Sequence, residues 1–174
     1  MIKILERLAQ WVLPPPPSEL ATATTTPEQS VARGIGEPGD LDAFAPFGLP
    51  PDRACLPQIR QVLEEQAECE RKGKPREDDL ALMCAVQLFA CAEPADVLNI
   101  WRAKRSGMDL DFSLGVQLLC GMGLNETKAW LQSQANRECT AIYDYICSCQ
   151  ASGDFDGFSP ASELEMHVTY FSGT

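Results

Sequence analysis

The sequence predicts an all-α fold, a short α-solenoid or irregular bundle of stacked antiparallel helical hairpins. Two general observations support this prediction. Apolar residues between positions 56 and 151 recur at intervals of three and four, the spacing of one face of an α-helix. No two alternating apolar segments are joined by turn residues, as a β-hairpin would require.

An internal echo is the third observation. Val86–Phe89 reads VQLF, and thirty positions later Val116–Leu119 reads VQLL. Each is followed by a break rich in proline or glycine, and then by a segment with helical spacing that carries Trp101 or Trp130. This pattern indicates a pair of helices that is repeated along the chain, in which each pair buries an apolar face against the next pair.

The chain divides into two predicted parts, residues 1–54 and residues 55–174. Residues 2–13 have the spacing of a short amphipathic helix, which the prolines 14–17 end. The remainder of the first part is rich in Thr, Pro, Gly and Ala and predicts an extended arm. Three apolar residues could pin the end of this arm to the folded body: Phe44, Phe47 and Leu49.

The folded body is predicted to begin near Leu56, where Pro57 suits the first turn of a helix that ends at Gly73. Residues 78–92 are apolar on nearly every side, as expected of a central helix. The next helix begins at 93–96, and the short connection predicts that these two helices form an antiparallel hairpin.

The rest of the body follows the same scheme. Residues 107–111 read as a turn, and residues 114–120 as a helix. A helix from about residue 125 completes a second hairpin. Residues 137–151 form a longer helix, and a last short helix ends near Tyr170.

Net charge and hydropathy limit the classes of partner. The chain of 174 residues carries 25 acidic and 14 basic side chains, a net charge of −11. Such a surface repels phosphate backbones and anionic membranes, so we expect neither nucleic acid nor membrane as a partner. It attracts a basic protein and speeds encounter with one. Because the start lacks a continuous apolar segment and no stretch could span a bilayer, a cytoplasmic location is expected.

Eight cysteines are present, and most fall on the apolar faces of the expected helices. A thiol in that position acts as a small buried hydrophobe, so we expect reduced cysteines. Cys147 and Cys149, with Cys139 and His167, are a weak zinc candidate, because residues two apart on a helix diverge by about half a turn.

Residues 152–163 resemble the calcium-binding loop of an EF-hand. Asp154 and Asp156 occupy the third and fifth positions, a glycine the sixth, and Glu163 the bidentate twelfth. Serine replaces the usual first aspartate, and a proline stands at the ninth position. The resemblance implies calcium as a possible ligand of Asp154, Asp156 and Glu163; the alternative is a solvated turn that caps a helix. No other cofactor is predicted.

Catalytic motifs do not emerge. The sequence has one histidine, near the C-terminus, and neither a Gly-x-Ser-x-Gly motif nor a phosphate-binding glycine loop. It therefore lacks the motifs of a hydrolase or of a nucleotide-binding enzyme. We therefore expect a binding protein and not an enzyme.

The leading hypothesis is an acidic protein-binding module, in its most concrete form an immunity-type protein that occludes the basic active site of a bacterial toxin or effector. A helical-repeat adaptor or chaperone that grips a peptide between hairpins is one alternative. A calcium-responsive module at residues 152–163 is another. Under the leading hypothesis, these carboxylates contact the basic partner: Glu64, Glu65, Glu68, Asp109, Asp111, Asp154 and Asp156.

Overall fold

A computed structural model describes residues 44–77 and 79–173. This part of the chain forms seven α-helices and short 3₁₀ helices, with no β-strand, so the all-α prediction is confirmed. The elements are η2 (Arg53–Cys55), α2 (Leu56–Arg71), α3 (Leu80–Cys91), α4 (Asp96–Lys104), α5 (Met108–Ser113), η3 (Val116–Leu119), α6 (Leu124–Ser133), α7 (Arg137–Ala151) and α8 (Pro160–Ser172). None of these helices is both long and apolar enough to cross a lipid bilayer. The expected helix at residues 2–13 and most of the expected arm lie outside the described residues.

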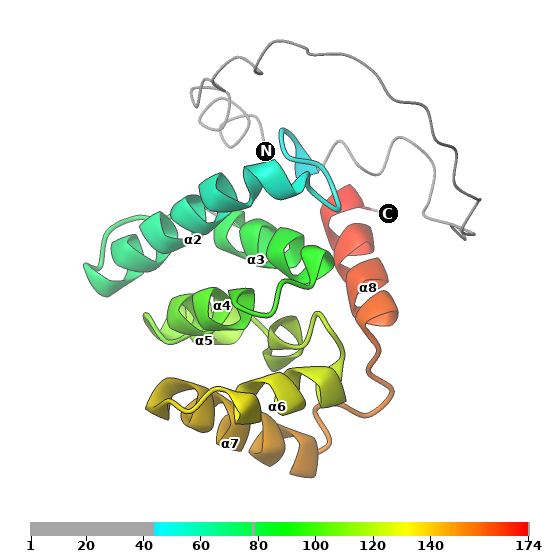
Figure 1. Cartoon of the computed structure of the whole chain (residues 1–174). Helices are drawn as coiled ribbons and strands as arrows, with labels where there is room; N and C mark the ends of the chain where they lie inside the picture. Colours follow the sequence, from blue (N-terminus) through cyan, green and yellow to red (C-terminus); the bar gives the residue numbers. More distant parts are fainter. Residues whose placement is uncertain (1–43, 78, 174) are drawn as a thin grey trace, which may run out of the picture.

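The helices are stacked in layers (Figure 1). α2 and α3 form one layer, α4 and α5 the next, and α6 and α7 the third, while α8 runs along the side of the stack and contacts α3. α4 lies in the middle, because it contacts α2, α3, α5, η3 and α7.

Local sequence explains α2 and α3. Pro57 stands in the first turn of α2, where its missing N–H costs no hydrogen bond. The apolar face of α2 is buried, and α3, apolar all round, is buried along nearly its whole length. The two helices run antiparallel, since an ion pair joins Arg53, just before α2, to Glu93, just after α3.

The pairing of helices differs from the expected hairpins. α3 makes its most extensive contacts with α2, and α6 makes its own with α7. α4 also packs on α2, where Arg60 donates Nε and Nη2 to the carboxylate of Asp96 at 2.7 and 3.0 Å. Asp96 is only 2% exposed, so its charge requires such a partner, and this pair fixes α4 against α2.

The segment between α4 and α6 corrects two element predictions. The expected turn at 107–111 is the start of α5, whose acidic residues lie in the first turn, where the helix dipole favours them. The expected helix at 114–120 is only the 3₁₀ helix η3. Gly115 and Gly121 bracket this short segment, which leaves too few residues to sustain an α-helix. The echo of Val86–Phe89 therefore adopts a different secondary structure.

The end of the expected arm is packed on the body, as its apolar residues suggested. Phe44 is fully buried and Leu49 is 6% exposed. The buried amide of Gln87 donates to the carbonyls of Phe44 and Gly48, each at 3.0 Å. The rings of Phe44 and Phe171 meet edge to face at 5.1 Å, so α8 closes over this segment.

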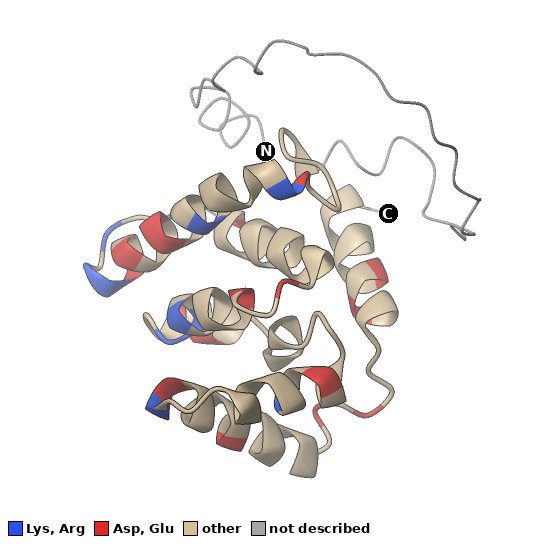
Figure 2. Ribbon diagram, in the orientation of Figure 1, with Lys and Arg blue, Asp and Glu red and all other residues tan. Residues whose placement is uncertain are grey.

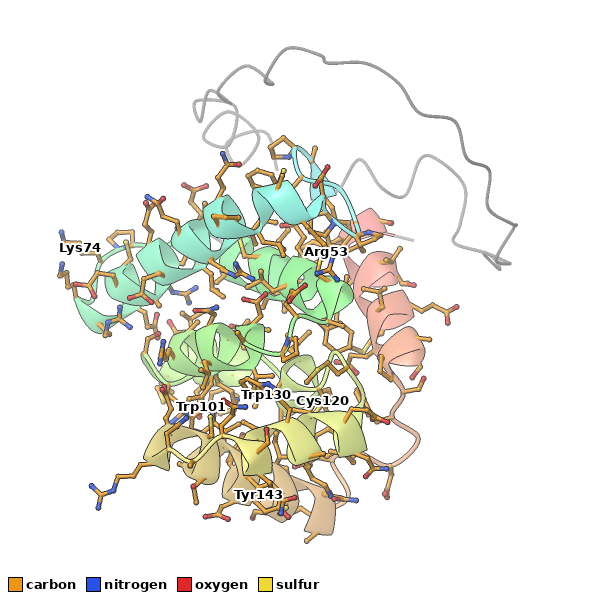
Figure 3. The ribbon with its side chains drawn as sticks, viewed as in Figure 1. Arg53, Lys74, Trp101, Cys120, Trp130 and Tyr143 are labelled. Atoms are coloured by element: carbon orange, nitrogen blue, oxygen red, sulfur yellow. The ribbon has the colours of Figure 1, made fainter. Side chains whose placement is uncertain are left out.

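One hydrophobic cluster runs through all layers. Trp101 and Trp130 are partly buried against it, and Figure 3 places both between the α4 layer and the α6–α7 layer. The rings of Trp101 and Tyr145 lie 5.2 Å apart, which joins α4 to α7. All eight cysteines are free thiols, and Cys84, Cys120 and Cys139 are buried.

Candidate functional site

The predicted acidic surface on α2 is largely neutralised by the chain's own cations. Arg71 pairs with Glu64 at 2.5 Å and with Glu68 at 2.8 Å, and Lys72 also reaches Glu68 at 2.6 Å. Hydrogen bonds from Lys72 and Arg71 lower the pKa of Glu68. Glu65 accepts a hydrogen bond from Gln61. These carboxylates are therefore mostly engaged within α2.

The other four predicted carboxylates lie on α5 and in the loop between α7 and α8. Asp109 is 3.9 Å from Arg76, and Asp111 is 3.1 Å from Lys104. Asp154 and Asp156 are exposed, and no cation in the described part of the chain pairs with either. Figure 2 shows the acidic residues spread over several elements, so the seven do not form one patch.

The EF-hand-like segment folds as a helix connection. Ser159 and Ser162 form a reciprocal capping box at the start of α8, and the proline of this segment is the first residue of that helix. Glu163 faces His167 within α8, with Oε1 at 3.3 Å from Nε2. In residues 44–77 and 79–173, no three His, Cys, Asp or Glu side chains converge in a way that could hold a metal ion. Asp154, Asp156 and Glu163 are thus not brought together as calcium ligands.

The buried cysteines have the properties of core residues. Desolvation raises the pKa of Cys84 and of Cys120 to about 12, so both remain protonated at neutral pH. Burial likewise raises the pKa of Cys91 and Cys149. A protonated thiol is a poor nucleophile and a poor metal ligand, so these four suit packing rather than chemistry.

The short helix α5 has an unusual exposed face. Met108 and Phe112, four residues apart, are 74% and 85% exposed, while Leu110 between them is fully buried. Residues four apart lie on the same side of a helix, so the two apolar side chains share one outward face. The sequence-based prediction of a turn at 107–111 did not place Met108 and Phe112 on one helix, so it gave no sign of their shared face.

A carboxylate from α2 secures the start of α5. Glu70 Oε1 accepts a hydrogen bond from the backbone N–H of Asp109 at 3.0 Å, and its Oε2 accepts from Arg76 Nε at 2.7 Å. Gly107, just before α5, leaves the space that Glu70 occupies, since a Cβ at that position would collide with this carboxylate. Glu70 thus supplies the cap that α5 lacks in its own sequence.

A buried lysine secures the end of α5. Lys104 is 4% exposed and donates Nζ to the carbonyls of Asp111 and Leu114 at 2.5 and 2.9 Å. The ammonium therefore satisfies backbone acceptors that a helix terminus leaves open. With both ends held, this two-turn helix presents Met108 and Phe112 from a fixed backbone.

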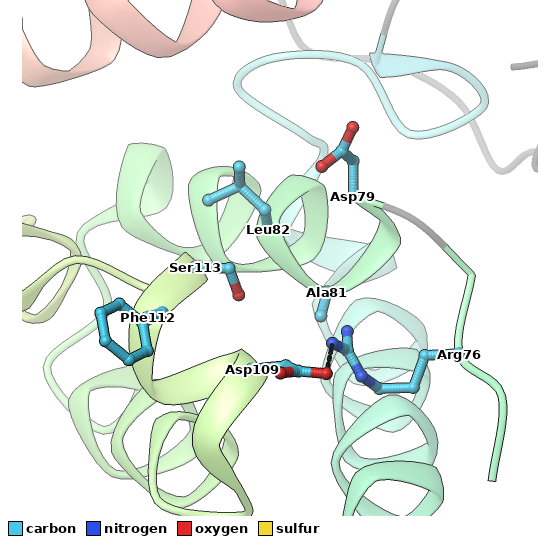
Figure 4. Close-up of a pocket in the computed structure, with 7 residues that line it drawn as sticks. All are labelled: Arg76, Asp79, Ala81, Leu82, Asp109, Phe112 and Ser113. Carbon is cyan, nitrogen blue, oxygen red and sulfur yellow. Dashed lines mark ion pairs between the residues drawn. The ribbon is translucent and has the colours of Figure 1, made fainter.

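A surface pocket of about 540 Å³ adjoins this face of α5. Figure 4 shows its lining, which we call the α5 pocket: Arg76, Asp79, Ala81, Leu82, Asp109, Phe112 and Ser113. The volume falls within the range of about 300–1,000 Å³ that ligand pockets occupy.

One wall of the α5 pocket is held by α8. Tyr170 donates its hydroxyl to Asp79 Oδ1 at 3.1 Å, and this hydrogen bond raises the pKa of Tyr170. Asp79 adopts a left-handed backbone conformation with φ 61°, which is uncommon for a residue other than glycine. The bond to α8 therefore helps to fix a locally unfavourable geometry at the pocket rim.

Comparison of the chain with protein-family models, with curated proteins and with solved structures yields no match.

Proposed function

We propose that this protein is a binding module for a basic protein, and that α5 with its pocket is the contact surface. The observation that carries the proposal is the exposure of Met108 and Phe112 on a helix secured at both ends. Aromatic side chains dominate the energetics of protein interfaces, and a fixed backbone reduces the entropy lost on binding.

Charge supports the basic partner. The chain has a net charge of −11, which steers a cationic protein toward it and raises the association rate at low salt. At the contact surface Asp109 has a side chain that is 76% exposed and pairs only distantly with Arg76. It is therefore available to a cation from the partner, whereas Glu64 and Glu68 are already paired within α2.

The most concrete form of the proposal is an immunity-type role. In that role the module covers the basic active site of a toxin or effector, and Phe112 supplies the apolar contact while carboxylates such as Asp109 replace an anionic substrate. The helical-repeat adaptor remains the second candidate, because the α5 pocket is also a groove into which a peptide side chain fits.

Capture and titration test the proposal. The full chain is immobilised, the captured protein is purified, and its affinity is measured by calorimetry at several salt concentrations. We expect one basic protein in a 1:1 complex that weakens as salt is raised. Phe112→Ser should lower its affinity at least tenfold, since an anchor residue contributes roughly 2 kcal/mol or more.

Met166→Ser is the matched control. Met166 is 53% exposed on α8 and does not line the α5 pocket, so its substitution should change the affinity less than twofold. Equal loss in both variants would contradict the proposed surface. Capture of many unrelated clients would favour the adaptor. Protection of growth against the captured protein by the wild type, lost in Phe112→Ser, would identify the immunity-type role.

A further inference from the structure

The α5 pocket combines carboxylates with an apolar floor. Figure 4 shows Asp79 above and Asp109 below the side chain of Ala81, with Leu82 and Ser113 to one side. Two carboxylates and one guanidinium line it, so its formal charge is negative.

The pocket's own cation is largely committed elsewhere. The Arg76 side chain is only 18% exposed, and its Nε donates to Glu70 at 2.7 Å. Its Nη2 lies 3.9 Å from Asp109, beyond hydrogen-bond distance. Asp109, 76% exposed, therefore keeps most of its capacity to accept hydrogen bonds from another cation.

Phe112 adds an aromatic wall. Its side chain is 85% exposed and extends from α5 on the side away from Arg76, so the ring is open to a ligand at the edge of the pocket. A guanidinium stacks on such a ring, gains cation–π attraction and can still present its N–H fork to a carboxylate. An ammonium lacks the planar surface that stacks and binds as a point charge.

We propose that the α5 pocket receives an arginine side chain of the partner, with the stem along Leu82, the guanidinium against the Phe112 ring and its N–H groups on Asp109. This inference rests on the proposed function, because it names the chemical group through which a basic partner docks. The pocket is thereby the determinant that distinguishes an arginine-bearing partner from one that is merely cationic.

Capped tetra-arginine, tetra-lysine and tetra-citrulline peptides are the probes. Each is titrated into the full, ¹⁵N-labelled chain, and amide shifts are followed by NMR. We expect tetra-arginine to shift the amides of Ala81, Leu82 and Ser113, with tetra-lysine binding about fivefold more weakly. The neutral isostere tetra-citrulline should leave these amides in place.

Two variants and one control decide the geometry. Asp109→Asn should weaken tetra-arginine about tenfold, as loss of a charged hydrogen-bond acceptor does, and Phe112→Leu should remove the preference for arginine over lysine. Asp144→Asn removes an exposed carboxylate of α7 that does not line the pocket, so it should have less than a twofold effect.

Shifts centred on another part of the surface would overturn the inference, as would equal binding of tetra-lysine or an equal effect of Asp144→Asn. The outcome is separable from that of the proposed function. A captured basic protein that binds Asp109→Asn as tightly as wild type would leave the binding module standing and remove the arginine pocket. If tetra-arginine binds at the pocket but no basic partner is captured, the arginine pocket stands and the proposed binding module for a basic protein is excluded.

Discussion

Two glutamines at equivalent places of the sequence echo tether two different loops. Gln87 donates to the carbonyls of Phe44 and Gly48, and Gln117 donates to the carbonyl of Asp154 at 2.6 Å. A buried or half-buried amide requires partners, and loop carbonyls outside regular structure require donors. The shared glutamine therefore has the same use in both places, although α3 and η3 differ in conformation.

At the residue scale, we predict that Gly121→Ala destabilises the fold. A Cβ at this position would lie 2.5 Å from the carbonyl oxygen of Phe89, and a backbone atom of α3 cannot move aside without shifting the helix. Overpacking of this kind costs about 1–3 kcal/mol. Urea denaturation followed by circular dichroism measures the loss.

Gly115→Ala is the control for this prediction. There the nearest atom is the Oε1 atom of Gln117, at 2.8 Å, so rotation of a side chain relieves the contact. The cost is at most the hydrogen bond from Gln117 to Asp154, about 0.5–1.5 kcal/mol. An equal loss of stability in both variants would show that close approach to α3 is not the cause.

At the scale of elements, α5 depends on groups that lie outside it. Six residues make too few internal hydrogen bonds for an independent helix. Glu70 of α2 secures its start, Lys104 of α4 its end, and the buried Leu110 anchors its middle. The exposed Met108–Phe112 face is therefore a property of three helices together.

We predict that Lys104→Met destabilises the protein by about 2–3 kcal/mol, because the buried carbonyl of Leu114 and the part-buried carbonyl of Asp111 lose their donor while the apolar stem is kept. Its neighbour provides the control. Arg105→Met removes a cation that is 55% exposed, and should cost less than about 1 kcal/mol. Hydrogen exchange of the α5 amides should accelerate in the Lys104 variant alone. Unchanged α5 protection would contradict the role of Lys104 as its terminal cap.

The contact between α4 and α7 predicts a dependence on pH. Arg102 forms a fork with Glu138 at 2.8 and 2.6 Å, and this hydrogen bonding lowers the pKa of Glu138 below its ordinary value of 4.5. A carboxyl with a depressed pKa stabilises the fold above its ordinary value and loses that contribution as the pH falls.

We therefore expect Glu138→Gln to be less stable than wild type at pH 7 by up to about 1 kcal/mol, the range for a partly exposed ion pair. The difference should diminish as the pH falls below about 4.5, where the wild-type carboxyl takes up its proton. Denaturant titrations of both proteins between neutral and acidic pH give the comparison. A difference that does not change with pH would exclude the ion pair as its source.

At the scale of the whole molecule, the layers share one core. The buried apolar residues form a single cluster from Phe44 to Phe155, and α4 contacts helices on both sides of the stack. Continuous packing of this kind favours cooperative unfolding rather than separate melting of layers.

We predict that Trp101 and Trp130 report the same transition. In a Trp11→Phe background, the Trp101→Phe variant keeps only Trp130, which reports on α6. The Trp130→Phe variant keeps only Trp101, which reports on α4. The two fluorescence midpoints in urea should coincide with the midpoint from circular dichroism. Separate midpoints would show that the α6–α7 layer unfolds independently.

The negative charge of the chain is not concentrated at one place on the molecule. Of the seven carboxylates predicted to bind a partner, Glu64, Glu68, Asp109 and Asp111 have cations of the same chain nearby. The excess negative charge is therefore spread over the molecule, and it suits steering of a basic partner better than a single contact patch.

The sequence by itself determined the helical class, most helix positions and the pinning of Phe44 and Leu49. These follow from local rules, because apolar spacing, proline in a first turn and a serine cap act within a few residues of where they stand. Tertiary structure alone decided which helices pair, that Val116–Leu119 is a 3₁₀ helix, and that Met108 and Phe112 face solvent. Each of these depends on contacts between groups that are distant in the chain, such as Arg60 with Asp96 and Glu70 with the start of α5. No local sequence pattern predicts such contacts.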